Sequence, residues 1–461
     1  MTKAEKKVFK GGDELELIVE KMVYEGAALA RVDGYPVFID GACPEDKLKV
    51  RIKRANKNYA QAEIIEVIEN SQYRVKPFCP IHNVCGGCGW QYIDYDYQLV
   101  QKRNIVEETV KKFTGKEIEI RPVLPSPQIR DYRSKIQYPV SQTKVSKRIL
   151  AGYYKKGSHE LVNVKFCPNQ PKIIDKITEF IRKTAQELEI SGYDEKKHIG
   201  ELRHLVFRYS RSENECIVIF VVNSNKLSEK FKKLAKKVMA EFAHVKGCLV
   251  NYNTSKTNLI MTGETNKIQG ENHIIEKIDG KTFKVSANSF FQVNIGSAQK
   301  IFDTVKNIIV ENYQAPRILD AYSGVSSFGI WLADVAKEVV SVEEAPSATK
   351  DAAENVVLNN ITNLTALNGD AKVIFEDLVA NGEKFDVTVL DPPRKGCEKE
   401  SLDFAINLSS KAIIYVSCNP TTLARDLAYL HQNGFETKYI QPVDMFCHTY
   451  HIESVAWLEK I

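Results

Sequence analysis

The sequence Arg317-Ile-Leu-Asp-Ala-Tyr-Ser-Gly-Val-Ser-Ser-Phe-Gly329 runs from an apolar strand, through a turn that contains glycine, into the start of a helix. Three more apolar, strand-like runs follow it, at Val339–Val342, Val387–Leu390 and Ala412–Val416, and helical segments separate them. Strands that alternate with helices in this way predict βαβ units and a parallel sheet. We therefore expect a doubly wound, Rossmann-like α/β domain over residues 286–461.

The chain before this domain shows two other patterns. Residues 10–70 read as short strands with glycine turns, and within them a basic face alternates with apolar residues at Lys47, Lys49, Arg51 and Lys53. Four like charges on one strand face repel one another unless an anion covers them. We expect a small β-barrel whose basic wall contacts nucleic acid, with an ordinary solvated face as the alternative. Residues 71–285 mix helices and strands and predict a middle α+β domain.

The composition places the protein in a broad class. The 461 residues are 43% hydrophobic and 27% charged, which is typical of a globular protein with several domains and excludes a disordered, collagenous or disulfide-stapled chain. No run approaches the roughly 18 apolar residues of a membrane span, and residues 1–10 are too charged for a signal peptide. We therefore expect a cytoplasmic protein without a membrane partner. The net charge of +5 permits a nucleic-acid partner without requiring one.

Acidic residues stand at the ends of three strands of the predicted parallel sheet, at Asp320, Glu343 and Asp391. Open α/β sheets bind ligands at this edge, and a carboxylate after the second strand can accept hydrogen bonds from both ribose hydroxyls. Each acid alone would fit a helix cap or a surface position equally well. The turn over 323–329 keeps only two glycines of the G-x-G-x-x-G pattern that cradles a pyrophosphate. We therefore expect an adenosyl cofactor without phosphate rather than a dinucleotide.

Two residues are candidates for the reacting groups. Cys418 follows an apolar strand and precedes a predicted helix, whose N-terminus would lower the pKa of the thiol and favour a thiolate. Cys397 and Cys447 also lie in loops but lack this setting. Glu453 opens an apolar terminal strand, where a carboxylate is costly unless it is used or paired. The two prolines after Asp391 make a rigid loop that suits positioning of a planar base.

The chain resembles the RNA 5-methyluridine methyltransferases, and in particular their iron–sulfur branch, which acts on ribosomal RNA. The matching motifs are Ser286-Ala-Asn-Ser-Phe-Phe-Gln-Val-Asn294, Asp391-Pro-Pro-Arg-Lys-Gly396, Val416-Ser-Cys-Asn-Pro420 and His448-Thr-Tyr-His-Ile-Glu453. Residues 10–70 look like a TRAM domain, an RNA-binding barrel of the OB type. The resemblance implies a class I methyltransferase domain that uses S-adenosylmethionine to methylate C5 of a uridine, with 23S ribosomal RNA as the substrate, no DNA partner and a monomeric state.

The resemblance also implies a role for individual residues. Cys418 would add to C6 of the target uracil, Glu453 would remove the C5 proton, and Asp391 would orient base and cofactor. The positions that match the cofactor-binding residues of the family are Gln292, Tyr322, Ser327, Glu343, Asp370 and Asp391. The chemistry agrees, because a covalent adduct divides one difficult step into two easier ones, and the target base must leave its stack. One departure is Ser326, where the family usually has glycine; a left-handed backbone there would cost about 1–2 kcal/mol.

Four cysteines form a separate signal. Cys79, Cys85 and Cys88 lie within ten residues, and Cys167 follows far downstream. In a reducing compartment such a set is metal-bound, catalytic or simply reduced. The spacing alone fits a four-cysteine zinc site as well as an iron–sulfur cluster. The resemblance implies a [4Fe–4S] cluster held by all four.

The middle domain also contains basic residues interleaved with aromatic ones, as stacking on unpaired bases requires. Those expected to face RNA are Arg133, Lys135, Arg203 and His204, with structural salt bridges as the alternative. Other functions remain open. The substrate could be transfer RNA, and the altered turn at Ser326 is the one feature that favours a non-catalytic RNA-binding or assembly factor. An amino-methyltransferase is disfavoured, because such enzymes have an aromatic residue at the position of Arg394.

Overall fold

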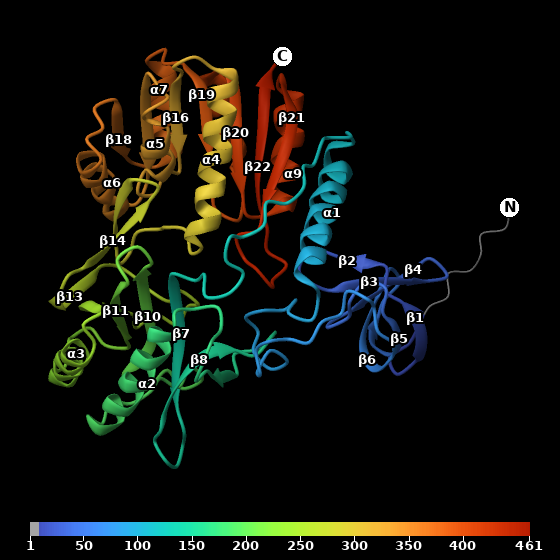
Figure 1. The fold of residues 1–461 in the computed structure, drawn as a ribbon, viewed down its shortest axis with the longest axis vertical. Helices are drawn as coiled ribbons and strands as arrows, with labels where there is room; N and C mark the ends of the chain where they lie inside the picture. Colours follow the sequence, from blue (N-terminus) through green and yellow to red (C-terminus); the bar gives the residue numbers. More distant parts are fainter. Residues whose placement is uncertain (1–8) are drawn as a thin grey trace.

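The computed structural model describes residues 9–461, so most of the N-terminal segment judged too charged for a signal peptide lies outside the described residues. Three large sheets follow one another along the described chain (Figure 1). The first is a small barrel, the second belongs to a mixed α+β unit, and the third forms the centre of an α/β domain. Within residues 9–461, no helix is long and apolar enough to cross a membrane.

The N-terminal barrel is a six-stranded sheet with the strand order β1-β5-β6-β4-β3-β2. Its core contains Leu48, Val50 and Ile52, the apolar residues of the alternating strand. The strands are β1 (Glu14–Ile18), β2 (Lys21–Met22), β3 (Ala28–Val32), β4 (Tyr35–Ile39), β5 (Lys47–Ala55) and β6 (Ala60–Glu69).

The basic wall expected on β5 is covered by acids of the same barrel. The Glu14 carboxylate of β1 forms ion pairs with Lys49 and Arg51, each with an N–O distance of 3.0 Å. A carboxylate oxygen of Glu63 in β6 lies 3.8 Å from Lys53 Nζ. The strand register sets the partners opposite one another, since Arg51 pairs with Glu14 on one side and Glu63 on the other. Lys49, Arg51 and Lys53 therefore have counterions within the barrel, so repulsion among them no longer argues for a bound nucleic acid, and contact of this wall with RNA stays a prediction.

The middle unit is a seven-stranded sheet with the order β13-β12-β11-β10-β7-β8-β9. Its two central strands are almost wholly buried, because α2 and α3 cover one face with apolar residues. The strands are β7 (Lys135–Gln142), β8 (Ile149–Tyr154), β9 (Leu161–Asn163), β10 (Leu202–Ser210), β11 (Glu215–Val222), β12 (Val245–Tyr252) and β13 (Thr265–Gly270), and the helices are α2 (Lys172–Glu187) and α3 (Glu229–Glu241).

The C-terminal domain confirms the predicted doubly wound fold. Its sheet has the order β18-β17-β16-β19-β20-β22-β21, in which β16 to β20 are parallel and β22 runs antiparallel to both of its neighbours. The strands are β16 (Arg317–Ala321), β17 (Glu338–Glu343), β18 (Leu364–Asn368), β19 (Phe385–Leu390), β20 (Ser409–Ser417), β21 (Phe435–Val443) and β22 (Glu453–Lys460).

Helices cover both faces of this sheet, because successive strand residues point to opposite sides. Ile318 packs into the core on one side and Leu319 into the core on the other. The first core includes residues of α4 (Ile295–Asn312) and α5 (Ser327–Leu332), with α6 (Pro346–Leu358) at its edge; the second includes residues of α7 (Ala371–Ala380), α8 (Lys399–Leu408) and α9 (Pro420–Gln432).

Two elements from the segment 71–285 pack against the C-terminal domain. Helix α1 (Tyr95–Thr114) shares a core with α9 and also reaches the barrel, where Gln101 Oε1 accepts the Met22 N–H at 3.0 Å. The hairpin of β14 (His273–Ile278) and β15 (Lys281–Ser286) bonds to α6, where the Asn355 side chain accepts the Lys284 N–H. In Figure 1, α1 lies between the barrel and the C-terminal sheet.

Candidate active site

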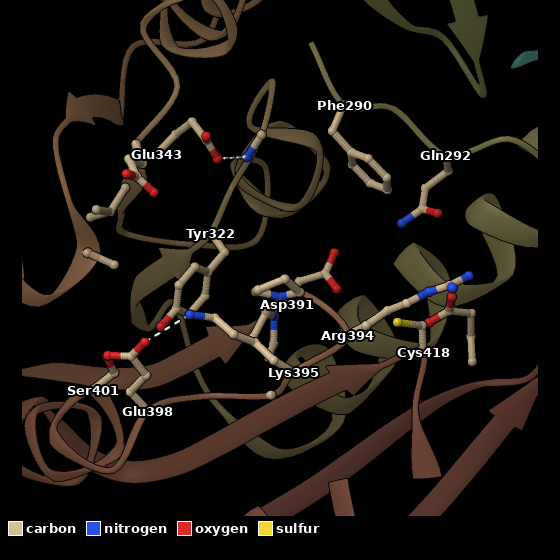
Figure 2. Close-up of a pocket in the computed structure, with 18 of the residues that line it drawn as sticks. Phe290, Gln292, Tyr322, Glu343, Asp391, Arg394, Lys395, Glu398, Ser401 and Cys418 are labelled. Atoms are coloured by element: carbon tan, nitrogen blue, oxygen red, sulfur yellow. Dashed lines mark hydrogen bonds and ion pairs between the residues drawn. The ribbon is translucent and has the colours of Figure 1, made fainter. Parts of the chain in front are cut away.

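A cavity of about 580 Å³ lies at the carboxyl ends of the parallel strands of the C-terminal sheet. The strand order reverses between β16 and β19, and open α/β sheets bind ligands where this happens. The predicted site residues that line the cavity are Gln292, Tyr322, Glu343, Asp370, Asp391, Cys418 and Glu453. In Figure 2, Phe290 and Gln292 approach from one side, and Asp391, Arg394 and Cys418 face them from the other.

Ser327 does not line this cavity, so its role in cofactor binding stays a prediction. It is the first residue of α5, and Gly324 is the residue of the same turn that borders the cavity. The turn therefore contacts the cavity at Gly324, three residues before α5 begins. The sequence motif gives the position of Ser327 along the chain but not the direction of its side chain.

Glu343 is held rigidly at the end of β17. Its two carboxylate oxygens accept the N–H groups of Gly324 and Ala345 at 2.8 Å each. Asp320, the acid at the end of β16, lies beneath the turn instead: it is fully buried and accepts the Gly329 N–H at 2.9 Å and the Ser341 hydroxyl at 3.1 Å. Burial raises the pKa of Asp320 to about 7. Glu343 therefore faces the cavity, whereas Asp320 stabilises the turn.

Ser326 adopts the left-handed conformation that its position in the turn requires, with φ 59° and ψ 43°. The residue is completely buried, and its hydroxyl has no hydrogen-bond partner. The departure from glycine thus carries the strain expected from the sequence, about 1–2 kcal/mol for a residue with a Cβ.

Cys418 and Glu453 come together through the antiparallel pairing of β20 with β22. Ser417 pairs with Ser454, so the residue after Ser417 meets the residue before Ser454 at the same end of the sheet. Glu453 is only 6% exposed. Burial raises the pKa of its carboxyl well above the usual range; nearby Asp391 adds to this, and Arg394 opposes it. The predicted nucleophile and the predicted acid–base group thus line one cavity.

The thiolate expected for Cys418 is contradicted by its surroundings. Burial and then the carboxylate of Glu453 raise the pKa of this thiol to about 12, and Arg394 lowers it only in part. The N-terminus of the following helix does little to lower this pKa. Pro420 has no N–H, and the Thr421 N–H already donates to the Asn419 side-chain oxygen at 3.0 Å. Cys418 is therefore a protonated thiol at neutral pH.

A buried network fixes the loop that carries Asp391 and Arg394. The Asp426 carboxylate accepts the Cys397 N–H at 3.0 Å and the Tyr415 hydroxyl at 2.6 Å. Cys397 is thus part of a structural contact, and Cys447, the other competing cysteine, is completely buried. Burial, followed by Asp320, raises the pKa of Asp391 to about 7.

Other residues that line the cavity had no predicted role. Four with large side chains are Phe290, Arg394, Phe446 and His451. Phe290, Arg394 and His451 lie inside the motifs that carry the family resemblance. Their positions could therefore be read from the sequence, whereas the direction of their side chains into the cavity could not. Phe446 belongs to a loop after β21 that is held by a buried ion pair from α1, between Lys102 and Asp444 at 2.6 Å. Such a long-range contact leaves no local pattern.

Comparison with known proteins now adds to this geometry. The tRNA (Uracil-5-)-methyltransferase family matches residues 94–461, and the TRAM domain matches residues 9–65. The chain belongs to the tRNA (uracil-5-)-methyltransferase family. It is an RNA methyltransferase with an N-terminal TRAM domain, as the resemblance implied.

Relatives of the same length support this membership in the uracil-5-methyltransferase family. A protein of Halalkalibacterium halodurans described as an uncharacterized RNA methyltransferase is 38% identical over 97% of each chain. One from Fusobacterium nucleatum with the same description is 35% identical over 99% of this chain and 98% of the relative. The crystal structure of Pyrococcus abyssi tRNA (uracil-54, C5)-methyltransferase in complex with S-adenosyl-L-homocysteine covers 96% of this chain and all of that chain, at 26% identity and a TM-score of 0.75.

The four cysteines of this family member are neighbours around the loop over 79–88. Burial, together with neighbouring cysteines of the set, raises the pKa of Cys88 to about 11 and that of Cys167 to about 12. The loop is tied to β8 and to the segment after Cys167, since Gly86 N–H donates to Tyr154 and the Asn169 amide donates to Cys88 Sγ at 3.1 Å. All four are free thiols, and within residues 9–461 no three possible ligands stand in metal-binding geometry. The four thiols thus lie in one region of the fold, but their spacing is not that of a metal site.

The basic residues expected to face RNA divide into two groups. Arg203 is buried and donates to the carbonyls of Asn253 and Ser255 at 2.6 and 2.7 Å, and burial lowers the pKa of His204 to about 4. Both side chains are buried, and within residues 9–461 neither makes the ion pair that the structural alternative supposed. Arg133 and Lys135 lie beside the motif of Gln292, and Lys135 makes no ion pair within the part of the chain that the structure describes.

Proposed function

We propose that this protein methylates C5 of a uridine in ribosomal RNA, most specifically 23S ribosomal RNA, through a covalent adduct with Cys418. The observation that carries the proposal is the placement of Cys418 and Glu453 at the same end of β20 and β22, in one cavity with Asp391. Uracil has no nucleophilic carbon of its own, and addition of a thiol at C6 makes C5 nucleophilic. A carboxylate at C5 must then remove a proton.

The proposed steps balance in protons and electrons. The Cys418 thiol loses its proton to solvent as sulfur bonds to C6, and the electron pair of the C5–C6 double bond shifts toward C5 and the O4 carbonyl. The electron pair at C5 then bonds to the methyl group that S-adenosylmethionine would supply, as the S–CH3 bond breaks and its electron pair stays on the sulfur, which becomes a neutral thioether. Glu453 removes the C5 proton, the double bond re-forms, and Cys418 leaves as a thiolate that recovers this proton from Glu453. The net reaction releases one proton.

The cavity offers matching groups for S-adenosylmethionine, which supplies an electrophilic methyl group when bound. Glu343 presents a carboxylate, fixed by two backbone N–H groups, to the ribose hydroxyls. Asp370 borders the cavity at the N-terminus of α7, on the side of Glu343, and is proposed to meet the adenine edge. Gln292 and Tyr322 line the remaining walls.

The experiment is a methyl-transfer assay with two substrates. Protein purified without oxygen receives labelled S-adenosylmethionine with unmodified ribosomal RNA or transfer RNA transcripts, and the labelled nucleoside is identified after digestion. We expect label in 5-methyluridine of ribosomal RNA, lost in Cys418→Ala and kept in Cys216→Ala, a buried cysteine of the middle sheet. Label in another nucleoside, or label that survives Cys418→Ala, would contradict the mechanism.

Transfer RNA is the second candidate substrate. The observation that favours it is the likeness, over nearly the whole chain, to the Pyrococcus abyssi enzyme, whose substrate is uracil-54 of transfer RNA. Label confined to transfer RNA in the same assay would select this candidate.

We also propose that Cys79, Cys85, Cys88 and Cys167 hold a [4Fe–4S] cluster. The support is the gathering of four buried or partly buried thiols from two segments of the chain, a donor set that suits such clusters. Iron and acid-labile sulfide measured on anaerobic protein should both approach about four per chain and fall together in Cys85→Ser. Stoichiometric zinc without sulfide would establish the zinc site instead.

A further inference from the structure

A second cavity, of about 810 Å³, lies beside the catalytic one. Its walls come from four parts of the chain: turns of the barrel, the segment 70–92 with the cysteine loop, the turn after β8 with Lys156, and the loop after β21. His451 lines both cavities, so the two meet at this side chain. A group bound in the second cavity would therefore lie next to whatever occupies the first.

Aromatic rings form a row from the barrel to the catalytic cavity. Tyr24 meets Tyr450 edge-on at 5.9 Å, Tyr450 meets His451 at 4.2 Å, and His451 meets Phe446 at 5.6 Å between ring centroids. The position of Tyr24 near the reacting groups is reflected in its pKa, which burial, Tyr450 and Cys418 raise to about 12. Rings of this kind bind unpaired bases by stacking, whatever the base.

The row is rigid before any ligand arrives. Gly26 has φ +92°, and a Cβ there would stand 2.8 Å from the ring of Tyr450. The Trp90 indole donates to the Gly26 carbonyl at 3.2 Å, and the Trp90 N–H donates to the His448 carbonyl at 2.9 Å. The barrel turn, the cysteine segment and the catalytic loop are thus locked together around Tyr450.

The cations of the second cavity are not equivalent. Arg74 is bound to Asp46 and to the Gly41 carbonyl, and Lys156 pairs with Asp40 at 2.8 Å. Lys76 is exposed and makes no ion pair within residues 9–461. It is therefore the side chain best placed to meet a phosphate.

We propose that the second cavity binds the nucleotide adjacent to the target uridine, with its base stacked on Tyr450 and His451 and its phosphate at Lys76. The inference rests on the proposed function, because it assumes that a uridine enters the catalytic cavity. Turning a base out of its stack leaves its neighbour without a stacking partner. A ring surface beside the catalytic cavity would replace that partner and hold the strand in register.

The test combines kinetics with cross-linking. We compare Tyr450→Leu, Tyr450→Phe and Lys76→Gln with Lys350→Gln, an exposed lysine of α6 outside both cavities. Tyr450→Leu should raise the KM for RNA about tenfold, as the loss of one stacked base implies. Tyr450→Phe should restore the wild-type value, and the KM for S-adenosylmethionine should stay unchanged throughout. Lys76→Gln should lower the salt slope of RNA binding by about one, and Lys350→Gln should not.

The cross-link locates the nucleotide directly. Once the methylated uridine is mapped, RNA with 4-thiouridine beside it is irradiated with the protein, and the attached peptide is sequenced. Attachment within residues 70–92 or 446–451 supports the proposal. Attachment elsewhere, or a Tyr450→Leu variant with an unchanged KM for RNA, would overturn it while leaving the methylation itself intact. Wild-type protein that methylates no RNA would overturn the proposed function as well.

Discussion

Replacing Lys102 by methionine should destabilise the protein by about 3–5 kcal/mol, because it leaves a buried carboxylate without its cation. Lys102 Nζ lies 2.6 Å from Asp444 Oδ1 and also donates to the Phe446 carbonyl at 3.2 Å, and both members of the pair are 0% exposed. The other side-chain partners of Asp444 are the Tyr95 hydroxyl at 2.8 Å and the Cys447 thiol, and both are neutral. Neutral hydrogen bonds cannot replace the lost ion pair.

The matched control is Lys21→Met, which breaks an ion pair of the same 2.6 Å length with Glu108 on the surface. An exposed pair contributes at most about 1 kcal/mol. The double variant Lys102→Met/Asp444→Asn removes both charges and should recover much of the stability, since the penalty comes from the unpaired charge.

The assay is urea unfolding followed by tryptophan fluorescence, with hydrogen exchange of residues 444–452 as a local measurement. We expect faster exchange in this loop for Lys102→Met, because the loop is anchored to α1 through this pair. A loss no larger than that of Lys21→Met, or a double variant less stable than the single one, would refute the reasoning.

Three other predictions concern the site. Burial raises the pKa of the Cys418 thiol to about 12 and that of the Glu453 carboxyl well above its usual range. Because attack needs a thiolate and proton removal needs a carboxylate, single-turnover methyl transfer should accelerate as pH rises from about 6.5 to about 9, and a rate that falls over this range would contradict the assignment. Ser326→Gly removes a left-handed side chain and an unpartnered buried hydroxyl, and should raise the free energy of unfolding by about 1 kcal/mol in urea titrations. Gly26→Ala should lower stability by about 1–2 kcal/mol and raise the KM for RNA, since its Cβ would displace Tyr450; an unchanged KM would mean that the ring does not contact RNA.

The C-terminal fold could be predicted because its strands are buried on both faces and read as continuous apolar runs. The same property placed Glu343 and Asp391 at the edge where parallel strands end. Cys418, predicted from its place after a strand, and Gln292, implied by the family resemblance, line the same cavity as these acids. Apart from Gln292, these predictions needed only local patterns and the geometry common to parallel sheets.

The remainder depended on contacts between distant segments. The pairing of Cys418 with Glu453 follows from the return of β22 between β20 and β21, which no local pattern announces. Burial and the neighbouring Glu453 raise the pKa of Cys418. These two effects are larger than the lowering of the pKa by the helix N-terminus, on which the thiolate prediction relied. In the barrel, the partners of the basic strand were set by register with β1 and β6, so Glu14 and Glu63 were not recognisable as counterions.

The central claim, attack by Cys418 on a uridine, is tested most directly with RNA in which the target uridine is replaced by 5-fluorouridine. Fluorine at C5 cannot leave as a proton, so the final elimination is blocked and the adduct accumulates. We predict that, with S-adenosylmethionine present, mass spectrometry finds the nucleotide, carrying one added methyl group, attached to Cys418. Attachment to another cysteine such as Cys397 or Cys447, or methylation of uridine-containing RNA with no adduct trapped on the fluorinated RNA, would contradict the account.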